Sequence, residues 1–289
     1  MTEATEARAA LRAAIDARLD EAARRWLREG LQEDAAAVRA LLAEVPRRTG
    51  RRHLIGAFAE RAAARLPGVW GEVPVGAWTL ADAARVLLLA ESAERAEAPY
   101  DALFRVYDLG DTETRVAALR ALNFVRRGDP ARGLELVLDA GRTYLTELLR
   151  AAWCDNPFSA VNLSDHDHRK AVLKAFFCDV PVAGFLRLEE RADAELAESL
   201  CEYIDERLAA GRSVPRALWS VAALHPQPGL VARLVGMLEH PDREERCVAA
   251  RALARARDAR AASFVRERLE REDDPEVRAA LEAALEELA

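Results

Sequence analysis

The sequence predicts an all-α protein, organised as an α-solenoid in which helical hairpins stack on one another. One observation is the composition. Ala, Leu, Glu and Arg, which are strong helix formers, dominate the 289 residues, whereas β-branched residues are sparse. The other observation is a repeated pattern with Asp first, Glu third, Arg fifth and Ala-Leu at the eleventh and twelfth places. It occurs in stretches that begin at Asp111, Asp242 and Asp274.

The repeated pattern suits the start of a helix. Asp accepts backbone N–H bonds as an N-cap, and Glu in the first turn lies near the positive end of the helix dipole. The second and third copies begin 32 residues apart, within the range of helix-pair repeats. The copy at Asp111 leaves open whether one array runs through the whole chain. We expect residues 212–289 to form a HEAT-like array, with helices over 214–224, 228–239 and 258–271.

The N-terminal region is also predicted to be helical. A first helix over 3–29 carries apolar residues at steps of three and four, which place them on one face. A second helix is expected over 33–44 and a third up to Leu66. Residues 67–78 are rich in Gly, Pro and Trp and form the clearest non-helical segment. Thr79 then begins a helix, with Asp82 in the position that completes a capping box.

Several classes of protein are disfavoured by composition and motifs. The net charge of −7 argues against nucleic-acid binding and against general adhesion to anionic membranes. The four cysteines form no C-x-x-C pair, and no apolar run approaches the length of a membrane span. The start of the chain does not resemble a secretory signal, so we expect a cytoplasmic protein without membrane insertion. No complete catalytic or cofactor motif occurs, so no catalytic residue, metal or cofactor is predicted, and an enzyme is the less favoured class.

The segment 153–174 is the most polar stretch of an otherwise Ala-, Leu- and Arg-rich chain. Its His and Asp side chains are suitable metal ligands, so a metal or acid/base site is one hypothesis. A helix N-terminus that attracts an anionic or polar ligand is a second, with basic residues close by. A loop that only joins two packed helices is a third. The candidate ligand- or partner-binding residues are Asp155, Asn156, His166, Asp167, His168, Arg169 and Lys174.

A capping interpretation competes with the metal hypothesis. Ser164 and Asp167 have the spacing of a capping box that leads into the apolar run 171–177. In a helix over 165–178, His166 and His168 lie about 200° apart and cannot share one ion. Helical zinc pairs use a spacing of four instead. We favour the cap and therefore predict no metal site.

Two further basic features are candidates for binding. The segment 46–53 is expected to be a basic loop, and Arg47, Arg48, Arg51 and Arg52 are a candidate anion or partner patch, although such runs are often only solvated. Lys174 lies within an apolar helix, where a lysine usually extends to the surface. A buried lysine there would have a lowered pKa and could act as a base or nucleophile.

The central part of the chain resembles the EboA domain family over roughly residues 75–255. The motifs that carry the resemblance are WTLADAAR from Trp78, DNPF from Asp155, VLKAFF from Val172 and the run Arg191 to Trp219. Members often have Trp or Tyr followed by Asn or Arg just before the Val-Leu-Lys block. His168 and Arg169 stand there in this chain, which weakens any argument for a shared pocket around His168. Together with the helical patterns and the repeats, the resemblance leads us to expect three parts: N-terminal helices (1–66), an EboA-like core (75–211) and HEAT-like repeats (212–289), or one continuous array.

The resemblance also implies a biological setting. The family is encoded in bacterial gene clusters beside enzyme-like proteins and a prenyltransferase-like membrane protein, and these clusters are associated with assembly or export of a secondary metabolite. EboA itself has no established reaction. We therefore expect a helical scaffold or adaptor that docks another protein of an Ebo-type pathway. The alternative is a small-molecule-binding protein or enzyme with its site in residues 153–174. Nucleic-acid binding by the helical array is the weakest hypothesis, because the chain is acidic.

Overall fold

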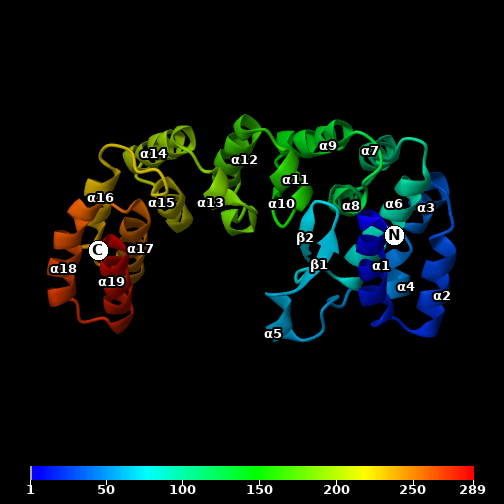
Figure 1. Cartoon of the computed structure of the whole chain (residues 1–289), viewed down its shortest axis with the longest axis horizontal. Coiled ribbons are helices and arrows are strands. Elements are labelled where there is room, and N and C mark those ends of the chain that lie inside the picture. Colours follow the sequence, from blue (N-terminus) through cyan, green and yellow to red (C-terminus); the bar gives the residue numbers. More distant parts are fainter. Residues whose placement is uncertain (1) are drawn as a thin grey trace. The chain divides into compact units, whose positions relative to one another are not determined.

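The computed structural model describes residues 2–289, which form an all-helical fold with one small β-hairpin (Figure 1). This confirms the predicted fold class. The described residues divide into two compact units. Unit 1 extends up to Ala171 and includes Cys178–Leu186, and unit 2 consists of Val172–Phe177 and Arg187–Ala289. Helix α12 (Asp165–Phe177) contributes its first half to unit 1 and its second half to unit 2.

Unit 1 contains eleven further helices, the hairpin and two short 3-10 turns. The helices are α1 (Glu3–Asp16), α2 (Glu21–Gly30), α3 (Ala35–Leu41), α4 (Val45–Thr49), α5 (Phe58–Arg61), α6 (Leu80–Arg95), α7 (Pro99–Leu109), α8 (Thr112–Ala121), α9 (Pro130–Arg142), α10 (Thr146–Trp153) and α11 (Pro157–Asn162). The strands are β1 (Arg65–Gly68) and β2 (Gly71–Pro74), and the 3-10 turns are η1 (Leu122–Phe124) and η2 (Val182–Gly184).

Helix α6 is the centre of unit 1. Its run Val86 to Ala90 is buried on every side, which is typical of a helix enclosed by others. Helices α1, α3, α4, α7 and α8 all pack against it. The predicted capping box is present: the Thr79 side chain accepts from the Asp82 N–H, and the Asp82 carboxylate accepts from the Thr79 N–H at 2.9 Å.

The hairpin β1–β2 docks against the neighbouring helices. The strands pair antiparallel, with Gly68 opposite Gly71 and a two-residue loop between them. Gly71 has φ +130°, a conformation that L side chains rarely adopt. The loop residues bind η1: the Val69 N–H donates to the Asn123 carbonyl at 2.8 Å, and Trp70 Nε1 donates to the Leu122 carbonyl at 3.1 Å.

Several N-terminal predictions are wrong in detail. The expected first helix is two helices, because Asp20 caps a new one by accepting from the Ala23 N–H at 2.8 Å. The expected basic loop 46–53 is partly helical, since α4 covers its first residues. The third helix does not reach Leu66, which lies in β1. Pro67, the first residue of the segment expected to be non-helical, lies in the same strand.

Unit 2 is built from helix pairs. Its helices are α13 (Leu188–Arg191), α14 (Ala194–Ala209), α15 (Arg216–Ala222), α16 (Leu230–Met237), α17 (Arg243–Ala256), α18 (Ala262–Arg271) and α19 (Pro275–Leu288), with a 3-10 turn η3 (Ala259–Ala261). Helices α15, α17 and α19 pack in succession, while α16 packs on α17 and α18 packs on α19. This succession is the predicted stacking of hairpins.

The three copies of the repeated pattern share one arrangement. Each Asp caps its helix: Asp111 accepts from the Thr114 N–H, Asp242 from the Glu244 N–H and Asp274 from the Glu276 N–H. The arginine at the fifth place turns back and donates to carbonyls at the end of the preceding helix or in the connection that follows it. Arg115 does so at Tyr107 and Gly110, Arg246 at His240 and Pro241, and Arg278 at Leu269 and Glu272. In each copy, the aspartate therefore binds the start of the following helix, and the arginine binds carbonyls at the end of the preceding helix or in the connection.

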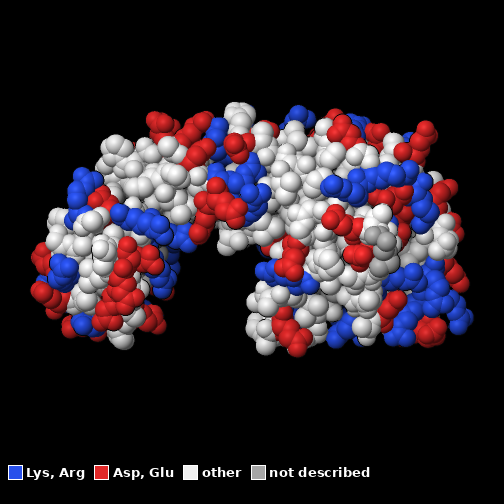
Figure 2. Space-filling view, in the orientation of Figure 1, with Lys and Arg blue, Asp and Glu red and all other residues white. Residues whose placement is uncertain are grey.

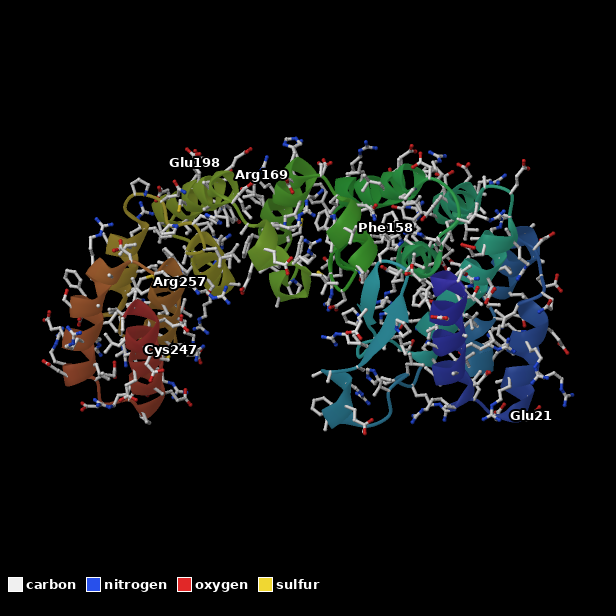
Figure 3. All side chains as sticks on the ribbon, in the orientation of Figure 1. Glu21, Phe158, Arg169, Glu198, Cys247 and Arg257 are labelled. Carbon is white, nitrogen blue, oxygen red and sulfur yellow. The ribbon has the colours of Figure 1, made fainter. Side chains whose placement is uncertain are left out.

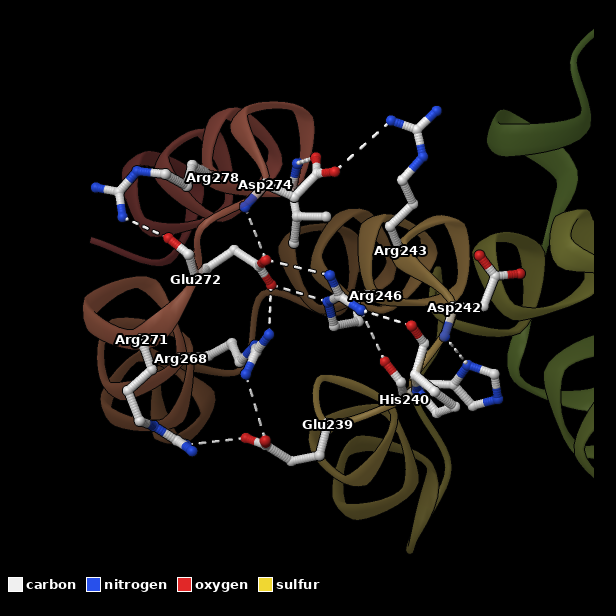
Figure 4. Close-up of polar contacts among 12 residues, drawn as sticks. Glu239, His240, Asp242, Arg243, Arg246, Arg268, Arg271, Glu272, Asp274 and Arg278 are labelled. Carbon is white, nitrogen blue, oxygen red and sulfur yellow. Dashed lines mark hydrogen bonds and ion pairs between the residues drawn. The ribbon is translucent and has the colours of Figure 1, made fainter.

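Glu272 is the most buried charge of the repeats. Its carboxylate accepts from Arg246 Nε at 2.8 Å, from Arg268 and from the Asp274 N–H at 3.0 Å, while Arg268 also contacts Glu239 (Figure 4). Burial alone would raise the pKa of Glu272. The hydrogen bonds from Arg246, Asp274 and Arg268 outweigh burial and lower the pKa from its ordinary value of 4.5 to about 2.

Replacing Glu272 by Gln is expected to destabilise unit 2 by about 3 kcal/mol at neutral pH, because two buried guanidiniums lose their carboxylate. The lowered pKa means that this stabilisation is complete above pH 4.5 and is lost as pH falls toward 2. Urea unfolding followed by circular dichroism at pH 7 and at low pH measures the difference. The matched control is Glu270→Gln, on the exposed side of α18. Equal stabilities of the Glu272→Gln and Glu270→Gln variants at pH 7 would contradict the prediction.

Candidate functional site

The Asp-Asn-Pro-Phe motif forms the corner between α10 and α11. Asn156 is buried and caps α11. Its Nδ2 donates to the Ala151 carbonyl at 2.8 Å, and its Oδ1 accepts from Asn123 Nδ2 at 3.0 Å. Asn123 Oδ1 accepts in turn from the Phe158 N–H at 2.8 Å. The two buried amides thus bind each other and four backbone groups, the carbonyls of Arg120 and Ala151 and the N–H groups of Phe158 and Ser159. Buried polar groups require such partners.

Phe158 connects this corner to the rest of unit 1. Its ring points into the interior (Figure 3), edge-on to Trp70 at 5.4 Å between centroids and 6.2 Å from Tyr100. Gly133 on α9 lies so close that a Cβ there would stand 2.8 Å from the Phe158 ring. The motif therefore holds the hairpin, α9 and α11 together.

The N-terminal half of α12 carries four of the candidate residues. Ser164 accepts from the Asp167 N–H at 3.1 Å and donates to the Asp167 carboxylate at 2.6 Å, as the capping interpretation predicts. His166 is exposed, whereas His168 is buried with its ring 6.1 Å from Phe185. Arg169 follows on the same helix and is half-buried. The two histidines therefore point to different environments. No group of three or more His, Cys, Asp or Glu side chains among residues 2–289 is arranged to hold a metal ion.

The remaining candidates, Asp155 and Lys174, lie outside the first half of α12. Asp155 is exposed in the left-handed region, with φ +53°, and its N–H donates to the Gly184 carbonyl at 2.7 Å. Although the residue is exposed, partial desolvation of its carboxylate raises the pKa of Asp155, and this outweighs the lowering effect of Arg65, Arg120 and Arg150. Lys174 is half-buried in the second half of α12, within unit 2. The candidates thus divide among the α10–α11 corner, the start of α12 and its second half.

The basic residues of 46–53 are mostly engaged within unit 1. Arg48 pairs with Glu44 at 3.1 Å, Arg51 pairs with Glu113 at 3.3 Å, and Arg52 donates to the Arg18 carbonyl. Arg47 is exposed on α4. The side chains stabilise the turn around α4, and Arg47 alone is left to act as an anion contact.

A groove of about 830 Å³ lies in unit 2 beside α17 and α19. Alanines line its floor, and both acidic and basic side chains line its rim, as they do elsewhere on the face shown in Figure 2. Arg255 on the rim pairs with Glu189 at 2.6 Å. Arg251 and Arg257 make no ion pair within residues 2–289. The sequence analysis missed this groove, although Arg251 lies within a repeat helix and Arg257 directly follows it, each next to an alanine.

Arg257 has an unusual backbone. It follows α17 in the left-handed region, with φ +50°, where glycine is the common residue. An L-residue in this region costs about 1 kcal/mol or more relative to glycine. The arginine is thus held at a position where its backbone conformation is unfavourable, at the edge of the groove (Figure 3).

Repeated helix pairs, capped and closed in the same way, define a helical-repeat protein of the HEAT class. A family model for HEAT repeats matches residues 199–286. A second family model, described as metabolite traffic protein EboA, matches residues 7–223. The chain therefore belongs to the EboA family, as the sequence motifs indicated, and the match includes N-terminal helices that the motifs did not reach. Comparisons with curated proteins and with solved structures found no match.

No helix among the described residues 2–289 has both the length and the apolar character that a membrane span needs.

Removing the Asn156 side chain is expected to destabilise unit 1 by about 2–4 kcal/mol, because the change leaves the Ala151 carbonyl and the Asn123 amide without partners and removes a cap. Chemical denaturation of Asn156→Ala followed by tryptophan fluorescence tests this. Asn123→Ala and the double variant complete a cycle, in which a coupling of about 1 kcal/mol is expected.

The control for this cycle is His166→Ala, an exposed position a few residues further on, where the change is expected to stay within about 0.5 kcal/mol. If Asn156→Ala matched this control, the amide pair would not be the structural centre of the corner.

Proposed function

We propose that this chain is a helical scaffold that docks another protein of a metabolite pathway, and that the groove beside α17 and α19 is the docking surface. The description of the family as a metabolite traffic protein supports the setting. Repeat proteins of stacked helix pairs commonly use such surfaces for binding. The observation that carries the proposal is the pair Arg251 and Arg257, two guanidiniums on the rim of one groove without ion-pair partners in residues 2–289.

The partner we infer is an acidic helical segment. Ala254, Ala280 and Ala284 are among the floor residues, and small side chains let a second helix approach closely. Carboxylates on that helix would complement Arg251 and Arg257. Among the remaining rim charges, Arg255 pairs with Glu189 at 2.6 Å and Glu276 pairs with Arg243 at 3.3 Å. Glu287 makes no ion pair within residues 2–289, so two arginines and one glutamate of the rim are left without ion-pair partners. Unpaired arginines at the rim of a groove favour an acidic partner over a basic one.

The alternative of a small-molecule site or enzyme in residues 153–174 has less support. The Asn156 side chain is buried and binds Asn123 and the Ala151 carbonyl at the corner between α10 and α11. His168 is buried with its ring near Phe185. Asp155 and His166 remain accessible, on separate elements.

The proposal predicts that the full chain, used as bait in extracts of its native host, captures a protein whose purified form then binds directly. Arg251→Gln combined with Arg257→Gly is expected to weaken that binding by about 100-fold, because two charge-assisted contacts are lost. Arg257→Gly should leave stability unchanged or raise it, since glycine suits the left-handed position. Weaker binding by the Arg257→Gly single variant therefore cannot come from misfolding.

The matched control is Arg266→Gln, an exposed arginine of α18 that does not line the groove. It should bind the partner as the wild type does. Equal binding by the groove variant and the wild type would rule out the groove as the docking surface. Failure of the wild type to bind directly any protein that it captures would contradict the scaffold function itself.

A further inference from the structure

A second cavity, of about 550 Å³, lies wholly within unit 1. Helices α3, α6 and α7, which pack against one another, supply most of its walls. Its volume lies within the range of sites for small organic molecules. It includes none of the candidate residues from the sequence analysis and is separate from the groove of unit 2.

Three arginines line this cavity, one from each helix: Arg39, Arg95 and Arg105. None of them pairs with a carboxylate within residues 2–289. Arg95 donates to the Glu33 carbonyl, Arg105 donates weakly to the Asp101 carbonyl at 3.3 Å, and the Arg39 side chain has no partner there. In a chain with 49 acidic and 42 basic residues, three unneutralised guanidiniums around one cavity are a local excess of positive charge.

The cavity contains one carboxylate, and that group is already engaged. Asp34 Oδ1 accepts from the backbone N–H groups of Ala36 and Ala37, at 2.9 Å each, as the N-cap of α3. It does not pair with any of the three arginines. The lining therefore carries a net positive charge.

The rest of the lining is largely apolar. Ala102 and Val106 are buried beneath the cavity, and Leu109 at its edge is 66 % exposed. Ser92 also lines it, but its hydroxyl donates to the Leu89 carbonyl at 3.1 Å within α6. The cavity thus combines an apolar surface with three cationic side chains.

We propose that this cavity binds a small organic anion that carries a hydrocarbon part. The carboxylate or phosphate group would lie among Arg39, Arg95 and Arg105, where guanidiniums can donate two parallel hydrogen bonds to such a group. The hydrocarbon part would cover Val106 and Leu109. This ligand site is independent of protein docking by unit 2.

The test is isothermal titration calorimetry of the full chain with n-octyl phosphate and with n-octanoate, whose relative affinities identify the anionic group. Neutral n-octanol and inorganic phosphate are the comparison ligands, each lacking one half of the proposed chemistry. We expect both amphiphilic anions to bind more tightly than either comparison ligand, and binding to weaken as salt rises. Affinity for alkyl phosphates should rise with chain length.

Arg39→Gln and Arg105→Gln should each weaken binding of the anions by about ten-fold or more, and the double variant further. Both side chains are exposed, so circular dichroism should show unchanged folding. The matched control is Arg142→Gln, an exposed arginine at the end of α9, which should bind as the wild type does.

Three outcomes would overturn the proposal: no binding of either anion by the wild type, equal binding of n-octanol, or unchanged affinity in the double variant. Binding only to phosphatidylcholine vesicles that contain phosphatidic acid, and not to the free anions, would also overturn it, since the surface would then recognise a membrane.

Discussion

Unit 1 depends on a single buried polar contact, the amide pair of Asn123 and Asn156. Each amide is removed from water, so each must find all of its partners inside the protein. They do so by binding each other and the backbone of α8, α10 and α11. Once η1 is fixed in this way, its carbonyls receive the hairpin, and Phe158 fills the space between them. The geometry of four elements thus follows from two side chains.

In unit 2, ion pairs connect the successive helix pairs, whereas in unit 1 a buried amide pair connects the elements. The first helical residue of one pair, Arg243, contacts Asp274 and Glu276 of the next, and Arg216 contacts Glu245 at 2.9 Å in the same manner. Exposed pairs of this kind contribute little one at a time. Glu272 differs because it is buried among two arginines, and its environment favours the ionised form strongly. The repeats are therefore connected by similar exposed ion pairs and by one buried cluster, in which Glu272 binds Arg246 and Arg268.

Much of the fold could be predicted from the sequence, because caps and periodic apolar residues act locally. The starts of helices at Thr79, Asp242 and Asp274 were all predictable from adjacent residues. The hairpin could not be predicted, because its strands are short and are stabilised by η1, which lies about fifty residues further along the chain. The break near Asp20 was missed because the apolar spacing continues across it.

The site was harder to predict than the fold. The sequence analysis selected Asn156 because it lies in a polar segment. Its role is structural, and this is visible only in the fold, where Asn123 lies beside it and donates to its amide oxygen. Conversely, Arg39, Arg95 and Arg105 are ordinary in the sequence. Their significance lies in their lack of ion-pair partners among residues 2–289, which depends on how three helices pack.

Helix α12 has one further consequence. Lys170 and Lys174 are the only lysines in the chain, since every other basic residue of the 42 is arginine. Apart from the terminal amine, amine-directed chemistry is therefore confined to one helix. Acetylation, ubiquitin attachment or a lysine-reactive dye would all report on α12, while the arginine-lined surfaces of both units would stay unmodified.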